Sequence, residues 1–236
     1  MVSRLDDGGL GVPLLGEIMV SARPYEEYLT MFGLDEARVL RGPVLDCPGG
    51  ASSFSARLRK LGGSVVSLDP VYECSPQELD RRVDRELASA RERALQYPQL
   101  FDFSWAGGLD AQLGLWRGAA TEFLDDYTRH PGGYVVGALP RLPFRDRSFS
   151  LTLSGFLLFT YAGHFGPEGL LAAVRELIRV TDGEVRIHPL CDNAGGRVPG
   201  LDALLTQLSG VDLEVVDVEP TISPRASQTL VLRPRG

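Results

Sequence analysis

The sequence has little of several residue types on which common functions depend. Its 236 residues include three cysteines, three histidines and a single lysine, Lys60. The cysteines stand far apart and form no CxxC pair or His/Cys cluster, so we predict no metal site and no disulfide framework, and we expect reduced thiols. Lysine-dependent chemistry, such as Schiff-base formation, has one candidate, and Lys60 stands at a position typical of a helix surface.

Acidic residues outnumber basic ones, and long apolar runs are scarce. The formal net charge of −7 argues against non-specific nucleic-acid binding, because that binding depends on cationic side chains that neutralise phosphates. The longest apolar stretch, 151–163, is too short and too interrupted to span a bilayer. The N-terminus lacks the basic segment and apolar run of a signal peptide. We therefore expect a cytoplasmic protein, a monomer or homodimer, that binds neither nucleic acid nor membranes.

Apolar patterning predicts a Rossmann-like α/β fold, and the length suits one domain spanning residues 1–236. Strands are expected at 43–46, 64–68, 134–139, 149–154, 184–189, 213–218 and 229–232. Their alternation with helices predicts a seven-stranded, mainly parallel sheet that is covered on both faces. The last two strands follow each other without an obvious helix, so we expect an antiparallel hairpin at the end of the sheet.

Helices are predicted between these strands and ahead of the first one. The expected ranges are 25–32 within an N-terminal helical segment (1–40), a helix from Ser52 or Ser53 to Gly62-Gly63, one after the capping box Ser75–Glu78, a mostly helical 97–129, one from Gly166, and 201–208. About sixty residues separate the second and third strands, although a crossover needs only a dozen or so. The excess, 74–133, is predicted to be a helical insertion over one end of the sheet.

The chemistry is expected at a glycine-rich turn after the first strand. In an open parallel sheet, ligands bind at the carboxyl ends of the strands. Gly49 and Gly50 let a ligand approach the backbone closely, and the following helix offers free N–H groups. Asp69 ends the second strand, where an acid can accept both hydroxyls of a ribose, and Asp46 can attract an ammonium group. Both acids also have a purely structural explanation, as residues that stabilise turns.

Several motifs together resemble those of class I S-adenosylmethionine-dependent methyltransferases. Val44-Leu45-Asp46-Cys47-Pro48-Gly49-Gly50-Ala51-Ser52 resembles their motif I, and Val66-Ser67-Leu68-Asp69 the acidic end of their second strand. The stretch from Gly137 to Phe149 (GALPRLPFRDRSF) is similar to a segment of the subgroup often called type 11, and Glu176-Leu177-Ile178-Arg179-Val180 to the helix before their fifth strand. The resemblance covers 44–188, and the terminal hairpin is consistent with the reversed last strand of that family.

The resemblance implies a set of residues around S-adenosyl-L-methionine and its product, S-adenosyl-L-homocysteine. Asp46, Gly49 and Gly50 would surround the methionine part, Cys47 and Pro48 would line the turn, Asp69 would hold the ribose, Pro70, Ala138 and Leu139 would lie against adenine, and Ser154, Gly155 and Phe156 would lie beneath the sulfonium. The sequence departs from the family at four of its positions. Pro48 and Ser52 replace glycines, Ala138 replaces the acid that commonly contacts adenine, and Ser150 replaces an aspartate.

Catalytic residues are harder to predict, because methyl transfer from a sulfonium can rely on positioning and desolvation alone. Tyr161 and His164 follow the fourth strand and are the candidates to face the acceptor. Tyr161 could equally be a core aromatic residue, and His164 a loop residue that caps the next helix. His188 and Asp192 are weaker candidates of the same kind. The aromatic residues of the insertion (Phe101, Phe103, Trp105, Trp116) would form either its core or an apolar lid over the acceptor.

The sequence therefore predicts methyl transfer to a small-molecule acceptor, and two alternatives stay open. One is a methyltransferase-fold protein that binds the nucleoside weakly or not at all and acts as a partner or regulator. The other is a nicotinamide or flavin oxidoreductase, whose GxGxxG fingerprint the turn matches poorly. A hydrolase is not supported, because there is no GxSxG motif.

Overall fold

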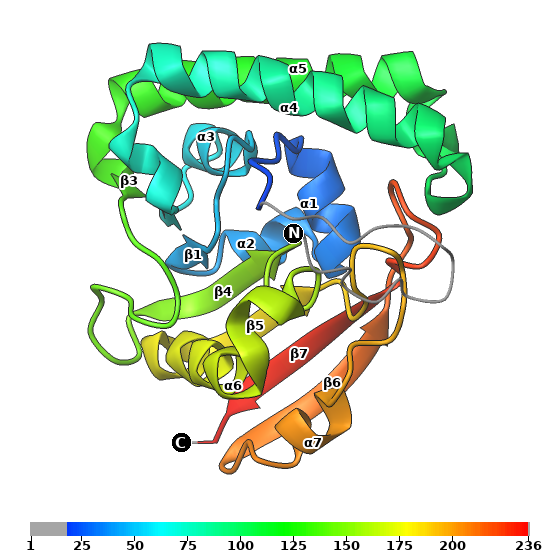
Figure 1. The fold of residues 1–236 in the computed structure, drawn as a ribbon. Helices are drawn as coiled ribbons and strands as arrows, with labels where there is room; N and C mark the ends of the chain where they lie inside the picture. The colour runs from blue at the N-terminus through cyan, green and yellow to red at the C-terminus, as the bar shows by residue number, and fades with distance from the viewer. Residues whose placement is uncertain (1–17, 236) are drawn as a thin grey trace, which may run out of the picture.

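Seven strands form one sheet in the order β3-β2-β1-β4-β5-β7-β6 (Figure 1). A computed structural model describes residues 18–235. The strands are β1 (Val44–Asp46), β2 (Val65–Leu68), β3 (Tyr134–Val135), β4 (Phe149–Gly155), β5 (Thr181–His188), β6 (Val211–Asp217) and β7 (Gln228–Pro234). The first five pair in parallel, whereas β7 runs antiparallel to both neighbours, β5 and β6. The predicted Rossmann-like sheet, mainly parallel with a reversed last strand, is confirmed.

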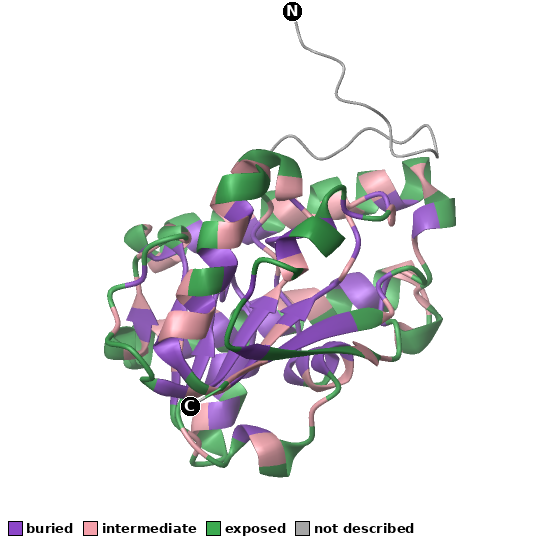
Figure 2. Cartoon of the chain, turned by 90° about the horizontal axis from the view of Figure 1, so that it is seen from below, coloured by how far each residue is buried: buried purple, intermediate pink, exposed green. Residues whose placement is uncertain are grey.

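Helices cover both faces of this sheet. They are α1 (Tyr25–Phe32), α2 (Glu36–Val39), α3 (Phe54–Lys60), α4 (Pro76–Gln96), α5 (Leu109–Arg129), α6 (Ala162–Val180) and α7 (Leu201–Leu205). Successive residues of β1 point to opposite faces, as expected for a strand. Val44 belongs to the apolar cluster that includes α1 and α3, and Leu45 to the cluster that includes α6 and α7. The strands at the centre of the sheet are accordingly buried along most of their length (Figure 2).

The helical insertion between β2 and β3 is confirmed as a pair of long helices. Ser75 and Glu78 form the predicted capping box, and Pro76 occupies the first turn of α4. Figure 1 shows α4 and α5 side by side across the top of the molecule, above α1 and α3. Their apolar faces, with Leu79 on α4 and Phe123 on α5, bury a hydrophobic cluster beneath them. This cluster is separate from those that pack on the two faces of the sheet. The insertion therefore covers the edge of the sheet where β1 and β2 end.

Several predicted boundaries were wrong. The third strand is two residues long rather than 134–139, since the chain leaves the sheet after Val135 and turns back on itself at an antiparallel bridge between Ala138 and Arg141. The sixth helix begins at Ala162 and kinks at Gly166, whose φ of 62° interrupts it. The seventh ends at Leu205. The short α2 was not predicted.

The N-terminal part of the predicted helical segment, residues 1–17, lies outside the described residues. Within 18–235, no helix has both the length and the apolar character needed to cross a bilayer.

Candidate functional site

Asp46 and Asp69 lie at the same edge of the sheet, as predicted. Asp46 is the last residue of β1 and pairs in register with Ser67 of the parallel strand β2. Asp69 follows Ser67 by two residues. The turn between β1 and α3 lies beside both acids, and Gly49 N–H donates to the carbonyl of Leu68 at 3.1 Å. Both carboxyl groups are buried, with Asp46 0% and Asp69 7% exposed.

The chain's own groups occupy the polar atoms of this turn. The two carboxylate oxygens of Asp69 accept from Gly50 N–H at 2.9 Å and from Val71 N–H at 3.0 Å. The Tyr72 hydroxyl donates to the Gly50 carbonyl at 2.9 Å, and a Cβ on Gly49 would collide with that hydroxyl. Asp69 thus stabilises the turn in this conformation, and each of its oxygens already accepts one hydrogen bond from the chain.

An extended segment before α1 closes the turn from the other side. We call residues 19–23 the N-terminal strap. Ala51 N–H donates to the Ser21 carbonyl at 2.9 Å, and Ser53 N–H to the Arg23 carbonyl at 3.0 Å. Gly50, with φ of 53°, brings the turn so close that a Cβ there would lie 2.7 Å from the Ser21 oxygen. The amides predicted to face a ligand therefore bind the strap.

Burial dominates the electrostatics of the turn. Burial raises the pKa of Asp46 well above its ordinary value, and the nearby charge of Asp69 raises it further. The Tyr28 hydroxyl, which donates to the Asp46 carboxylate at 3.2 Å, lowers this pKa by a smaller amount than burial raises it. Burial also raises the pKa of Asp69 and of the Cys47 thiol. Since the charge of Asp69 disfavours ionisation of Asp46, a cation placed near both carboxyl groups would be stabilised. An ammonium or sulfonium group has that character.

The other predicted cofactor residues lie in three places: in the glycine turn, after the strands β2 and β3, and at the end of β4. Pro48 is half-buried in the turn, whereas Pro70 and Ala138 are exposed and Leu139 packs against the main core. Ser154 and Phe156 lie at the end of β4. Ser154 is fully buried, and its hydroxyl has no hydrogen-bond partner among the described residues.

Phe156 is in an unusual backbone conformation, with φ of 51°. A bulky side chain rarely adopts a positive φ, and such strain is concentrated at functional sites. The guanidinium of Arg23 stacks on its ring at 3.8 Å. The strained residue thus joins the end of β4 to the N-terminal strap.

A cavity of about 160 Å³ opens on the far side of the strap from the glycine turn. It lies between α4, the N-terminal strap and the loops that follow β4 and β5. Its lining is mostly apolar, and the insertion contributes Phe101, Phe103 and Trp116. Phe101 and Phe103 stack with ring centroids 5.6 Å apart. These three aromatic residues fit the lid interpretation, whereas Trp105 does not line the cavity.

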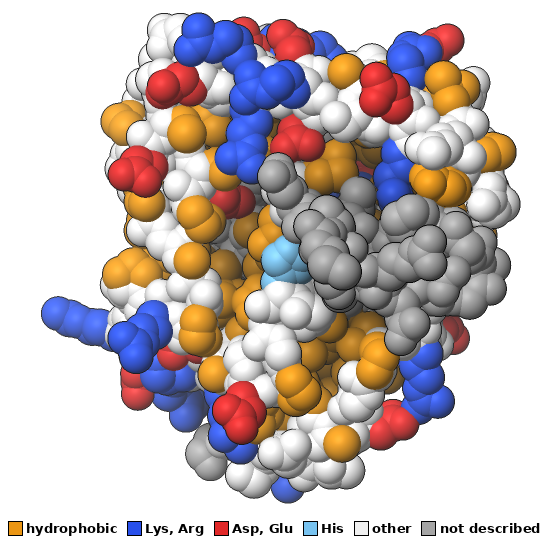
Figure 3. Space-filling view, viewed as in Figure 1, with side chains coloured by type: hydrophobic (Ala, Val, Ile, Leu, Met, Phe, Trp, Pro, Cys, Tyr) orange, Lys and Arg blue, Asp and Glu red, His pale blue; other side chains and the backbone are white. Residues whose placement is uncertain are grey.

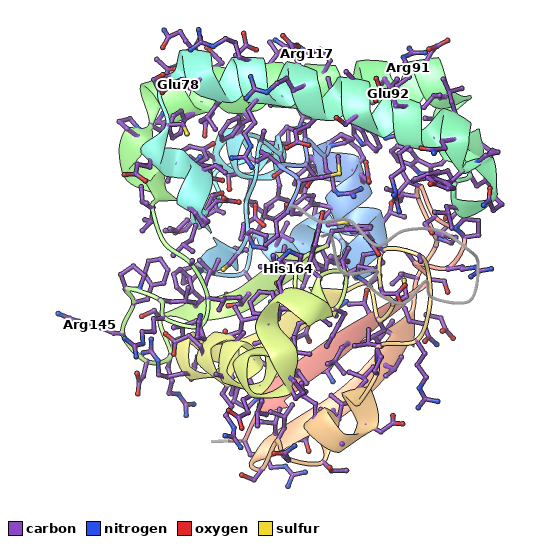
Figure 4. The ribbon with its side chains drawn as sticks, in the orientation of Figure 1. Glu78, Arg91, Glu92, Arg117, Arg145 and His164 are labelled. Carbon is purple, nitrogen blue, oxygen red and sulfur yellow. The ribbon has the colours of Figure 1, made fainter. Side chains whose placement is uncertain are left out.

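The two catalytic candidates lie in different environments. Tyr161 lines the cavity, and its hydroxyl accepts from Met19 N–H at 3.1 Å. Because burial raises its pKa, the phenol is protonated at neutral pH and binds the strap rather than acting as a base. His164, in the first turn of α6, is exposed and lies outside the cavity lining, on the face seen in Figures 3 and 4.

Two further candidates have structural partners. His188 is buried, and its Nδ1 lies 2.9 Å from the Thr229 hydroxyl oxygen. Asp192 lines the cavity, but its carboxylate accepts from Ala194 N–H at 2.9 Å and from Gly196 N–H at 2.7 Å. Neither residue is placed like a general base facing a substrate.

A buried ion pair beside the cavity was not predicted from the sequence. Arg23 of the strap pairs with Glu27 of α1, which is 0% exposed. Glu27 also accepts from Trp116 Nε1 at 3.1 Å and from the Thr221 hydroxyl at 3.3 Å. The spacing of four residues was visible in the sequence, but it is equally typical of an exposed helical pair.

Comparison with known proteins establishes neither a family nor an activity for this chain. No family model matches the chain. An uncharacterised protein of Methanocaldococcus jannaschii, MJ0045, is 27% identical over 195 residues, which cover 82% of this chain and 87% of the relative.

Solved structures of methyltransferases share the fold in outline. One is the 1,6-didemethyltoxoflavin-N1-methyltransferase of Burkholderia thailandensis (16% identity, TM-score 0.47, 85% of this chain and 75% of that one). Others are an rRNA methylase of Streptococcus thermophilus (14%, 0.45, 85% and 93%) and a SAM-dependent methyltransferase of Methanosarcina mazei (13%, 0.41, 84% and 95%). Similarity at this level supports no inference about substrate.

Proposed function

We propose that the protein is an S-adenosylmethionine-dependent methyltransferase for a small-molecule acceptor. The observation that carries the proposal is the placement of Asp46 and Asp69 on adjacent parallel strands, on either side of the glycine turn, with a cavity at the same edge of the sheet. The motifs that resemble those of the methyltransferases lie in this sheet in the expected order.

The residues present fit the cofactor on one condition. Asp46 would stabilise the charged methionine part, and Asp69 would hold the ribose once it releases Gly50 N–H. The N-terminal strap would have to leave the turn, since Ser21 and Arg23 bind its amides. When bound, the cofactor supplies an electrophilic methyl group. The chain's part is to hold donor and acceptor in line and to exclude water, for which the apolar lining is suited.

A second function is favoured by the occupied turn. A protein with the same fold that never binds the nucleoside would use Asp69 and Tyr72 only to hold the turn closed. In that case the replacement of the motif's glycines by Pro48 and Ser52 follows from the loss of the ligand. The protein would then act as a binding partner or regulator.

Calorimetric titration distinguishes these functions. S-adenosylmethionine, S-adenosylhomocysteine and NADH are titrated separately into the purified protein. Micromolar binding of the first two supports the proposal, silence with all three supports the non-catalytic alternative, and binding of NADH alone refutes both.

A substituted protein then tests the assigned site. Asp69→Asn keeps an acceptor for the Gly50 amide but loses the charge, and it is expected to weaken S-adenosylhomocysteine binding by about tenfold or more, since a hydrogen bond to a charged group contributes about 1.5–3 kcal/mol. Asp125→Asn, at an exposed position of α5, is the control. Unchanged affinity in a folded Asp69→Asn protein would refute the ribose role.

A further inference from the structure

The cavity beside the strap has the lining of a ligand site rather than of a packing defect. Its apolar walls include Phe101 and Phe103 from the insertion and Phe156 from the end of β4. An apolar cavity of roughly 150 Å³ in another protein accommodates benzene, and this one has about 160 Å³. A molecule built on one aromatic ring is therefore the size and shape of occupant that these walls favour.

Buried polar groups in the same lining have no partner. Among the described residues, Arg23 Nε, Thr160 Oγ1 and Asn193 Oδ1 make no hydrogen bond, although all three residues line the cavity. Arg23 is 6% exposed. Buried polar atoms in native proteins are nearly always satisfied. Donor and acceptor groups that remain free around one cavity indicate a ligand with polar substituents of its own.

The charges around the cavity indicate the sign of one substituent. Arg93 of α4 lines the cavity, and no carboxylate of the described residues lies within ion-pair distance of its guanidinium; it donates to the Asn193 carbonyl at 3.5 Å. Partial burial lowers the pKa of Arg93. An arginine guanidinium nevertheless keeps its proton in proteins, so the side chain stays cationic.

The other charged groups in the lining are already engaged. Arg23 pairs with Glu27, Glu86 accepts from the strap amide of Val20 at 3.4 Å, and Asp192 binds two amides of its own loop. Glu86 also lies 3.6 Å from the guanidinium of Arg82. Of the two cations in the described lining, Arg93 is thus the one that lacks a counter-ion.

We propose that this cavity binds an aromatic carboxylic acid. The ring lies among the aromatic walls, the carboxylate faces Arg93, and a ring substituent accepts a hydrogen bond from Arg23 Nε. The assignment of this acid as the methyl acceptor rests on the proposed function, whereas the binding site itself does not.

The test measures binding without any nucleoside, so its result is separate from that of the cofactor titrations. Benzoate and the neutral benzyl alcohol are titrated calorimetrically into the full-length protein. We expect the acid to bind about tenfold more tightly, the gain expected from a charge-assisted hydrogen bond. Arg93→Gln should remove that preference and leave the affinity for the alcohol unchanged.

Two control proteins complete the experiment. Arg85→Gln changes an exposed arginine on the same helix, outside the cavity lining, and should bind like the unsubstituted protein. Ala90→Phe fills the cavity without altering a charge and should abolish binding of both compounds. Equal affinities for acid and alcohol, an acid preference that survives Arg93→Gln, or no binding of either compound would overturn the proposal.

Discussion

His188 provides a prediction whose magnitude follows from the structure. The ring is 2% exposed, at the end of β5, and packs edge-on against Phe32 and Phe156. The Thr229 hydroxyl donates to the Met31 carbonyl at 2.7 Å, so its oxygen is left to accept from the Nδ1–H of a neutral His188. Burial, with a smaller contribution from the charge of Arg23, lowers the pKa of His188 to about 3.

The sign of the pH dependence follows from linkage. In the unfolded chain the pKa of histidine is about 6.5, so below that pH the unfolded state binds a proton that the folded state excludes. Stability is therefore lost as the pH falls from about 6.5 toward 3. At about 1.36 kcal/mol per pH unit, the drop from pH 6.5 to pH 5 removes about 2 kcal/mol.

Asp46 and Asp69 act in the opposite direction. Their pKa values are raised in the folded protein, so they add stability as the pH falls and partly mask the effect of His188. Comparison with His188→Gln isolates the histidine, because the glutamine amide can still donate to the Thr229 oxygen.

The assay is urea unfolding of both proteins at several values between pH 5 and 7.5. The stability of the unsubstituted protein relative to His188→Gln should fall by about 2 kcal/mol as the pH is lowered from 7.5 to 5. NMR should show a neutral His188 ring at every pH in this range. Parallel stability curves for the two proteins, or an imidazole that titrates near pH 6.5, would refute the reasoning.

Three other substitutions test the packing described above, each by urea unfolding at pH 7. Glu27→Gln leaves the buried charge of Arg23 without its partner and should cost about 3–5 kcal/mol; a loss below about 1 kcal/mol would show that the pair is not buried in solution. Gly49→Ala places a methyl group against the Tyr72 hydroxyl and should cost about 1–3 kcal/mol. Gly118→Ala, in α5 with open space around its Cα, should instead gain about 0.5–1 kcal/mol, and the reverse order of these two glycine variants would contradict the structure.

The sheet could be predicted from the sequence because its signals are local. The apolar run 43–46, the turn at Gly49 and Gly50 and the second strand ending at Asp69 follow each other closely, and a short parallel βαβ unit permits few arrangements. The capping box at Ser75 fixed the start of α4 for the same reason. Short elements such as α2 carry too little periodicity to be recognised.

The closed state of the turn could not be predicted, because it depends on contacts between distant segments. Ser21 and Arg23 reach Ala51 and Ser53 through backbone atoms, which leave no mark in the side-chain pattern. Tyr72 follows Asp69 closely in the sequence, but only the structure shows its hydroxyl bound to the Gly50 carbonyl.

The role of Arg93 was equally hidden. Its lack of a counter-ion in the described lining emerges only when the cavity and the partners of its neighbours are known.

The most direct test of the account is hydrogen exchange of the N-terminal strap with and without S-adenosylhomocysteine. Met19 N–H and Val20 N–H are bonded to Tyr161 and Glu86 in the closed form. If the nucleoside takes the place of the strap at the glycine turn, these amides should exchange faster at saturating ligand, while those of β4 do not change. A ligand that binds without altering exchange in 19–23, or no binding at all, would contradict the claim that this turn is a nucleoside site.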